Sequence, residues 1–237
     1  MRFLALAMLA AALPFAAVAQ ERTDLNMVVS LDRSESVNAE EAIAQIQGLI
    51  HALTHERFIG AIQSGTHGRI GFAVVKWSSF NRSEVILPWT VIADLADAEA
   101  VSTRLYTAMK KRRPSPDGTQ TDLAFGIEVA TAMLDAAPYR ATRDVINIVG
   151  DGLSNIGRLP SVDRDIALSR GITINALIMA KGRAVPVLTR YFEREVIGGP
   201  LAFVHHATNV AEFAIAMLRK MVLEMAYFQA LDAPRPL

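Results

Sequence analysis

Short apolar runs alternate along this chain with longer segments in which apolar residues recur at helical spacing. Residues 26–31 (NMVVSL) form one such run, which is typical of a buried strand. Residues 39–62 instead place Ile43, Ile46 and Ile50 at intervals that put their side chains on one face of a helix. The hydrophobic pattern therefore predicts a protein that contains both strands and helices.

The predicted elements follow one another in regular alternation. Strands are predicted over residues 26–31, 69–77, 83–87, 144–149, 172–179 and 202–206. Helices are predicted over residues 39–62, 98–111, 121–136, 162–170, 185–196 and 209–228. Only the short polar link 78–82 separates the second and third strands, which favours an antiparallel hairpin. Helices join the other strands, which predicts an α/β fold with a doubly wound, mostly parallel central sheet. The sheet is expected to have one antiparallel edge strand and helices on both faces, which gives the three layers of a Rossmann-type fold.

Composition supports a single domain with a substantial core. Apolar residues make up 51% of the 237-residue chain, and neither an internal repeat nor a linker-like segment interrupts the pattern. The 24 basic and 24 acidic residues balance, so the overall charge favours neither nucleic acid nor anionic lipid as a partner. The chain contains no cysteine and therefore no disulfide bond. We expect no nucleic-acid partner, and we expect the hydrophobic core alone to stabilise the fold.

The N-terminal segment 1–19 has the organisation of a secretory signal peptide. Arg2 precedes the apolar run 3–18, and the small residues at the end of this run form a cleavage signal. The alternative is a membrane anchor, but the run is short for a span of about 20 residues. We therefore expect cleavage after Ala19, a single domain over residues 20–237, and export to a bacterial periplasm or the extracellular space.

No later segment has the composition of a transmembrane helix. The helical pattern over residues 210–231 carries four charged side chains, those of Glu212, Arg219, Lys220 and Glu224. Charged side chains are costly inside a bilayer. This pattern instead predicts a helix that packs on the surface of the domain.

Three oxygen-bearing side chains follow the first predicted strand at every second position, those of Asp32, Ser34 and Ser36. Successive side chains of an extended segment point to opposite faces, so these three are expected to share one face. One carboxylate and two hydroxyls form a hard, weakly charged oxygen site, which suits Mg²⁺ or Mn²⁺ better than zinc or copper. In isolation, Asp and Ser at this spacing are also common helix caps and turn residues.

Two later loops are expected to complete this oxygen site. Thr119 lies in residues 117–121, a glycine-containing loop that leads into a helix, and Asp151 lies between two glycines after the strand 144–149. Ligands of open α/β sheets bind at the carboxyl ends of the strands, where these loops should meet. Oxygen donors for most of the octahedral positions that Mg²⁺ prefers would then come from Asp32, Ser34, Ser36, Thr119 and Asp151.

These motifs resemble those of a von Willebrand factor A (VWA) domain with a metal-ion-dependent adhesion site (MIDAS). The signature of that site is D-x-S-x-S, a later Thr in a G-T-x-T-like loop, and a later Asp-Gly at a strand end. All three parts occur here in this order, and the resemblance covers roughly residues 25–228. The chain is more narrowly similar to the exported bacterial family DUF1194, which the segment 196–200 (VIGGP) and the single-domain layout fit. One departure is Gly150, where the wider domain often has Thr, so that a hydroxyl beside the ligands is missing.

The resemblance implies a binding function, and we assign no catalytic residue. In such domains the metal has few charged ligands and stays electrophilic, so that a carboxylate of another protein can complete its coordination. We therefore expect an exported, non-enzymatic, divalent-metal-dependent protein-binding or adhesion module. The expected ion is Mg²⁺, with Mn²⁺ and Ca²⁺ as alternatives, and the expected partner is an unidentified protein that offers an acidic group.

Two other functions remain open. A Mg²⁺ site on a doubly wound sheet could hydrolyse phosphate esters. Ser34, however, stands where the common D-x-D phosphatase pattern has Asp, and the chain contains no P-loop, G-x-G-x-x-G or G-x-S-x-G motif. The other alternative is a subunit of an envelope complex whose metal site is vestigial, although the retention of all the ligand types argues against it.

Two further patterns have simpler structural interpretations. His51 and His55 lie one turn apart on a predicted helix and could bind zinc, but Ala52 replaces the Glu of the metalloprotease pattern, which favours ordinary helix histidines. The basic run 110–113 (KKRR) could bind phosphate or an acidic surface. Its position at a helix C-terminus, where the helix dipole favours cations, favours a solvated helix end instead.

Overall fold

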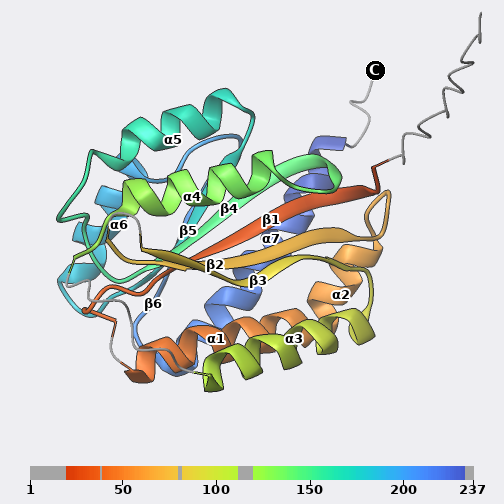
Figure 1. The fold of residues 1–237 in the computed structure, drawn as a ribbon, viewed down its shortest axis with the longest axis horizontal. Helices are drawn as coiled ribbons and strands as arrows, with labels where there is room; N and C mark the ends of the chain where they lie inside the picture. Colours follow the sequence, from red (N-terminus) through yellow and green to blue (C-terminus); the bar gives the residue numbers. More distant parts are fainter. Residues whose placement is uncertain (1–19, 38, 80–81, 112–119, 233–237) are drawn as a thin grey trace, which may run out of the picture.

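The computed structural model describes residues 20–37, 39–79, 82–111 and 120–232 (Figure 1). In this part of the chain, helices flank one six-stranded sheet. The strands are β1 (Arg22–Asp32), β2 (Ile70–Trp77), β3 (Ser83–Ile92), β4 (Arg140–Gly150), β5 (Thr173–Met179) and β6 (Val204–Ala207). The helices are α1 (Ala39–Thr54), α2 (Glu56–Gln63), α3 (Leu95–Lys110), α4 (Leu123–Asp135), α5 (Pro160–Ser169), α6 (Ala184–Glu195) and α7 (Val210–Asp232). The signal peptide predicted over 1–19 lies outside the described residues.

The strands lie in the order β3-β2-β1-β4-β5-β6. β2 and β3 pair antiparallel, and every other neighbouring pair in this sheet is parallel. Parallel neighbours need crossover connections, and the helices that provide them cover both faces of the sheet (Figure 1). The prediction of a doubly wound, mostly parallel sheet with one antiparallel edge strand is confirmed.

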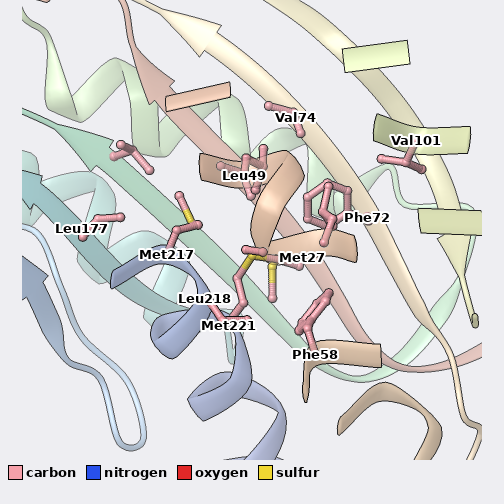
Figure 2. Packing of buried hydrophobic residues seen from close by; sticks show 14 of the residues in the cluster. Met27, Leu49, Phe58, Phe72, Val74, Val101, Leu177, Met217, Leu218 and Met221 are labelled. Carbon is pink, nitrogen blue, oxygen red and sulfur yellow. The ribbon is translucent and has the colours of Figure 1, made fainter. Parts of the chain in front are cut away.

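β1 runs through the middle of the sheet and packs against helices on both faces. On one face, Met27 belongs to a cluster with Leu49 of α1 and Met221 of α7 (Figure 2). On the other face, Val28 belongs to a second cluster, to which α4, α5 and α6 contribute. Because side chains alternate along a strand, Asp32 at the end of β1 lies on the same face as Val28.

The helix predicted over 39–62 is interrupted at His55. α1 ends at Thr54 and α2 begins at Glu56, because His55 has an extended backbone conformation (φ −76°, ψ 134°). The imidazole Nδ1 of His55 accepts a hydrogen bond from the backbone N–H of Arg57 (3.2 Å) and so caps α2. The prediction of one continuous helix is wrong, because apolar spacing continues across the break and only the local cap reveals it.

Helix α7 is less superficial than its charges predict. Arg219 is exposed, whereas Lys220 and Glu224 are fully buried. Lys220 Nζ lies 2.7 Å from Glu224 Oε1, and the side-chain amides of Asn147 and Asn175 each donate to the Glu224 carboxylate (2.9 Å). The prediction of a surface position is wrong for this pair, since residues four apart on a helix can neutralise each other out of contact with water. Among the described helices, none combines the length and the apolar character that a bilayer span requires.

Candidate metal centre

The carboxyl ends of two adjacent parallel strands bring Asp32 and Asp151 to the same edge of the sheet. β1 ends at Asp32, and β4 ends at Gly150, directly before Asp151. Leu31 is paired with Val149, so the next residues along the two strands, Asp32 and Gly150, are neighbours. A Cβ atom at Gly150 would lie only 3.6 Å from Asp32 Oδ2. The parallel pairing of β1 and β4 therefore places both carboxylates in one site.

After Asp32 the chain turns sharply instead of continuing as an extended segment. Asp32 Oδ1 accepts a hydrogen bond from the backbone N–H of Ser34 (2.7 Å). The next residue after Asp32, Arg33, donates its backbone N–H to the carbonyl of Trp77 in β2 (2.7 Å). An aspartate that bonds the backbone two residues ahead is a common turn device. The predicted strand-like alternation is wrong, and this turn is what brings Ser34 and Ser36 toward Asp32.

Hydrogen bonds join four of the five predicted ligands in one continuous network. The hydroxyl oxygens of Ser34 and Ser36 are 3.0 Å apart, and Ser36 Oγ donates a hydrogen bond to Asp151 Oδ1 (2.8 Å). Asp32 is joined to the same network through the backbone of Ser34. Thr119, the fifth predicted ligand, lies outside the described residues. The structure thus brings together Asp32, the two serines and Asp151, as the sequence predicts.

The carboxyl group of Asp32 is buried and only half satisfied. Asp32 is 0% exposed, and its Oδ2 atom has no hydrogen-bond partner among the described residues. Burial raises the pKa of Asp32 from 3.8 to about 7, the hydrogen bonds from Ser34 oppose this rise, and the charge of Asp151 adds to it. A buried carboxylate oxygen without a partner is costly. A cation at this position would remove that cost.

Asp151 lies in the same electrostatic environment. It is half-buried, and burial raises its pKa, against the effect of the hydrogen bond from Ser36 and with a smaller contribution from the charge of Glu41. A bound divalent cation reverses such effects, because it stabilises both carboxylates in their charged form. The donor set of carboxylate and hydroxyl oxygens fits Mg²⁺. Across the described ranges, no three His, Cys, Asp or Glu side chains gather as they would in a typical zinc site.

Two residues that the sequence analysis did not identify hold the neighbouring loop in place. Asn155 Oδ1 accepts a hydrogen bond from the backbone N–H of Thr121 (2.8 Å), and the N–H of Asn155 donates to the carbonyl of Thr121 (3.0 Å). Ser154 Oγ accepts from the N–H of Leu123 (3.1 Å) at the start of α4. The loop after Asp151 is thereby fastened to the segment that precedes α4. The sequence signal for these two residues was the polar pair Ser154-Asn155, which follows shortly after Asp151-Gly152.

The histidine pair has a structural explanation. The rings of His51 and His55 contact each other edge to face, with centroids 5.6 Å apart, and His55 also caps α2. In the portion of the chain that is described, they do not belong to any group of three metal-binding side chains. In the basic run, Lys110 Nζ lies 4.5 Å from the ring centroid of Tyr106, while residues 112 and 113 lie outside the described residues.

Comparison with known families identifies the family of this chain. The model of DUF1194, described as a protein of unknown function, matches residues 22–229. The chain belongs to the DUF1194 family. A comparison with curated proteins finds no match. The function of this DUF1194 protein is therefore inferred from its own site and fold.

Solved structures similar to the DUF1194 protein include matrix and pilus proteins. One is proximal thread matrix protein 1 from the mussel byssus with a zinc-occupied MIDAS motif (19% identity, 86% of this chain, 46% of that chain, TM-score 0.56). Another is the vWF domain of the type V pili tip protein Mfa5 from Porphyromonas gingivalis (11% identity, 91% of this chain, 98% of that chain, TM-score 0.58). A third is the pilus adhesin SpaC from Lactobacillus rhamnosus GG (14% identity, 87% of this chain, 31% of that chain, TM-score 0.59).

At these identities the likeness shows the fold, which is VWA-like, as the sequence resemblance implies. The DUF1194 chain spans less than half the length of the first solved relatives that it matches. What those longer proteins bind is therefore a matter for proposal in this chain.

Proposed function

We propose that this DUF1194 protein is an exported, non-enzymatic binding or adhesion module that recognises an acidic group of a partner protein through a divalent cation. The expected cation is Mg²⁺, with Mn²⁺ and Ca²⁺ as alternatives, and its ligands would be Asp32, Ser34, Ser36, Thr119 and Asp151. The observation that carries this function is the buried, unpaired Oδ2 of Asp32 next to a second carboxylate and two hydroxyls.

The charge of the site favours binding of a further anion. Asp32 and Asp151 together at most balance the charge of a divalent cation, and the serine hydroxyls are neutral donors. When bound, Mg²⁺ would supply a Lewis acid that keeps an attraction for another oxygen ligand. A carboxylate of a partner protein has the hardness and the charge that such an ion prefers.

The protein also orients its donors in advance. The backbone N–H of Ser34 holds Asp32 Oδ1 (2.7 Å), and Ser36 Oγ holds Asp151 Oδ1 (2.8 Å). Donors that are already ordered lower the entropic cost of binding. This order supports a site that binds its ion without a large rearrangement of β1 or β4.

The solved relatives support the same function. The zinc-occupied MIDAS motif of the mussel matrix protein supports metal binding by a fold of this kind. The pilus adhesin and the pili tip protein support a role in adhesion.

Calorimetric titration with Mg²⁺ and Mn²⁺ tests the metal centre. We expect binding by the wild type and loss of binding in Asp32→Asn and Asp151→Asn, since each substitution removes a charged oxygen donor without changing side-chain size. Glu35→Gln is the matched control, because Glu35 is an exposed acidic residue of the same turn. Circular dichroism of each variant shows that it is folded.

Acetate serves as a probe for the partner's carboxylate. We expect acetate to bind the Mg²⁺-loaded wild type and not the Asp32→Asn variant. Equal Mg²⁺ binding by wild type and Asp32→Asn would exclude the metal centre, as would a folded wild type that binds no divalent ion even with acetate present. Turnover of p-nitrophenyl phosphate by the wild type that Asp151→Asn abolishes would favour the hydrolase alternative.

A further inference from the structure

A groove lies at the carboxyl end of β1, on the α1 side of the sheet. It lies between α1, the end of α3 and the beginning of β3, and it encloses about 470 Å³. α1 and α3 lie side by side beneath the sheet (Figure 1). Leu31 and Arg33, the two neighbours of Asp32 in the chain, line the groove. Because side chains alternate along a strand, the groove lies at the end of β1 on the face of the sheet opposite to the Asp32 side chain.

The floor of the groove is apolar and open to solvent. Ile43 of α1 and Val85 of β3 are 43% and 48% exposed, and half-buried Met109 of α3 lies between these elements in the lining. Apolar side chains from separate elements that converge on one exposed hollow are typical of an interaction site. Other, buried residues such as Leu49 and Phe72 form the core on this face of the sheet. The core therefore does not need the exposed side chains of Ile43 and Val85.

The rim of the groove is predominantly basic. Among the described residues of the lining, Lys76, Lys110 and Lys111 contribute cations, and Glu84 contributes a carboxylate that pairs with Lys76 (2.7 Å). The lining thus carries an excess of positive charge around an apolar floor. A ligand of complementary character has apolar side chains flanked by negative charge.

We propose that this groove binds a peptide segment of the same partner that offers a carboxylate to the metal, and that this segment combines apolar side chains with further acidic ones. This role rests on the metal-dependent binding proposed above. A continuous peptide accounts for both features together, since one acidic side chain would reach the cation while its neighbours cross the end of β1 and enter the groove on the other face. Apolar contacts in the groove would supply affinity, and the basic rim would select acidic sequences.

Panning of a random peptide library on the Mg²⁺-loaded full chain provides the test, with Asp32→Asn as counter-selection. We expect enriched peptides to contain an apolar residue flanked by acidic residues. Binding of a synthetic copy should weaken about tenfold or more in Ile43→Ser and in the double variant Lys110→Glu/Lys111→Glu. Arg219→Glu, which reverses one charge on the exposed face of α7, is the control for charge reversal away from the groove and should bind the peptide normally.

Mg²⁺ titration of the same variants distinguishes a failure of the groove proposal from a failure of the proposed metal centre. If the groove variants bind Mg²⁺ like the wild type but lose the peptide, the groove is the peptide site. If Mg²⁺ binds but no peptide is enriched, or if the groove variants bind the enriched peptides normally, the groove proposal fails and the metal centre stands. If the wild type binds no divalent ion, both fail. Binding to phosphatidylglycerol vesicles that persists in Asp32→Asn and is lost in Lys110→Glu/Lys111→Glu would assign the groove to a membrane surface and overturn the peptide assignment.

Discussion

Two buried carboxylates in this protein have opposite environments. Glu224 in α7 is 0% exposed, and it receives hydrogen bonds from Lys220 (2.7 Å) and from Asn147 and Asn175 (2.9 Å each). Asp32 at the end of β1 is equally buried, but in the part of the chain that the structure describes its Oδ1 atom has a partner and its Oδ2 atom has none. Both lie against the same sheet, so burial alone does not explain the difference.

The difference separates a charge that the fold satisfies from one that it leaves incomplete. Lys220 neutralises Glu224 within one helix, and the two asparagines tie the pair to β4 and β5, so this group needs nothing from outside. Burial lowers the pKa of Lys220, and Glu224 opposes that effect. Asp32 has no such counter-ion among the described residues, and burial raises its pKa to about 7, so the fold disfavours its charged form until a cation binds. A buried charge that is left incomplete is therefore the stronger indication of a binding site.

The largest expected effect is on the satisfied pair. Lys220→Met leaves the Glu224 carboxylate buried without its counter-ion, and we expect the free energy of unfolding to fall by about 3–5 kcal/mol. Denaturant titration followed by circular dichroism measures this change. Arg219→Met is the matched control, because Arg219 is the exposed neighbour on the same helix, and it should change stability by less than about 0.5 kcal/mol.

Restoring charge balance should recover part of this loss. The double variant Lys220→Met/Glu224→Gln has no unpaired charge, and we expect it to be more stable than Lys220→Met. If Lys220→Met were as stable as Arg219→Met, the buried pair would not contribute to the fold as described.

The next effect is a dependence of stability on pH in the metal-free protein. The pKa of Asp32 is about 7 in the folded protein and near 3.8 in the unfolded chain, so between these values the folded state binds more protons. Stability should therefore fall as pH rises from about 4 to about 7 and then level off. A rise of the pKa from 3.8 to about 7 corresponds to a loss on the order of 4 kcal/mol.

Unfolding at pH 5 and pH 8 in EDTA measures the part of this loss that lies between these two pH values, about 3 kcal/mol. Asp32→Asn isolates the contribution of Asp32 from that of other carboxyl groups. We expect the variant to show a smaller fall than the wild type. Addition of Mg²⁺ at pH 8 should stabilise the wild type and leave Asp32→Asn unchanged. Equal pH profiles for the two proteins would mean that Asp32 is satisfied in solution in a way that the structure does not show.

The smallest effect concerns Gly150, the position next to the incomplete carboxylate. Gly150→Ser would place a hydroxyl within reach of Asp32 Oδ2, because the new Cβ lies 3.6 Å from that atom. Gly150→Ala adds the same Cβ without the hydroxyl and is the matched control. At pH 8 without metal we expect the Ser variant to be more stable than the Ala variant by about 1 kcal/mol. The difference should shrink when Mg²⁺ is present, and an Ala variant as stable as the Ser variant would show that the hydroxyl does not reach Asp32.

The alternation of strands and helices was predictable from local pattern, as were the segments that carry the site. Runs such as 144–149 are apolar because a central parallel strand is buried on both faces, and this signal lies within a few adjacent residues. Asp32, Ser34, Ser36 and Asp151 were predicted because their residue types and spacing carry the chemistry themselves. That strand-end loops meet follows from the parallel sheet, which the alternation of elements already implies.

What the tertiary structure decided is how distant residues meet and which charges are buried. The turn at Asp32 depends on a hydrogen bond to Ser34 that periodicity cannot show, and the break at His55 depends on a cap. Lys220 and Glu224 look like surface residues in the sequence, but asparagines on two different strands complete their burial. The sequence alone determined the order of elements and the donor set, because both are local properties. Packing determined which donors are satisfied and which remain free for a ligand, because that depends on contacts between residues far apart in the chain.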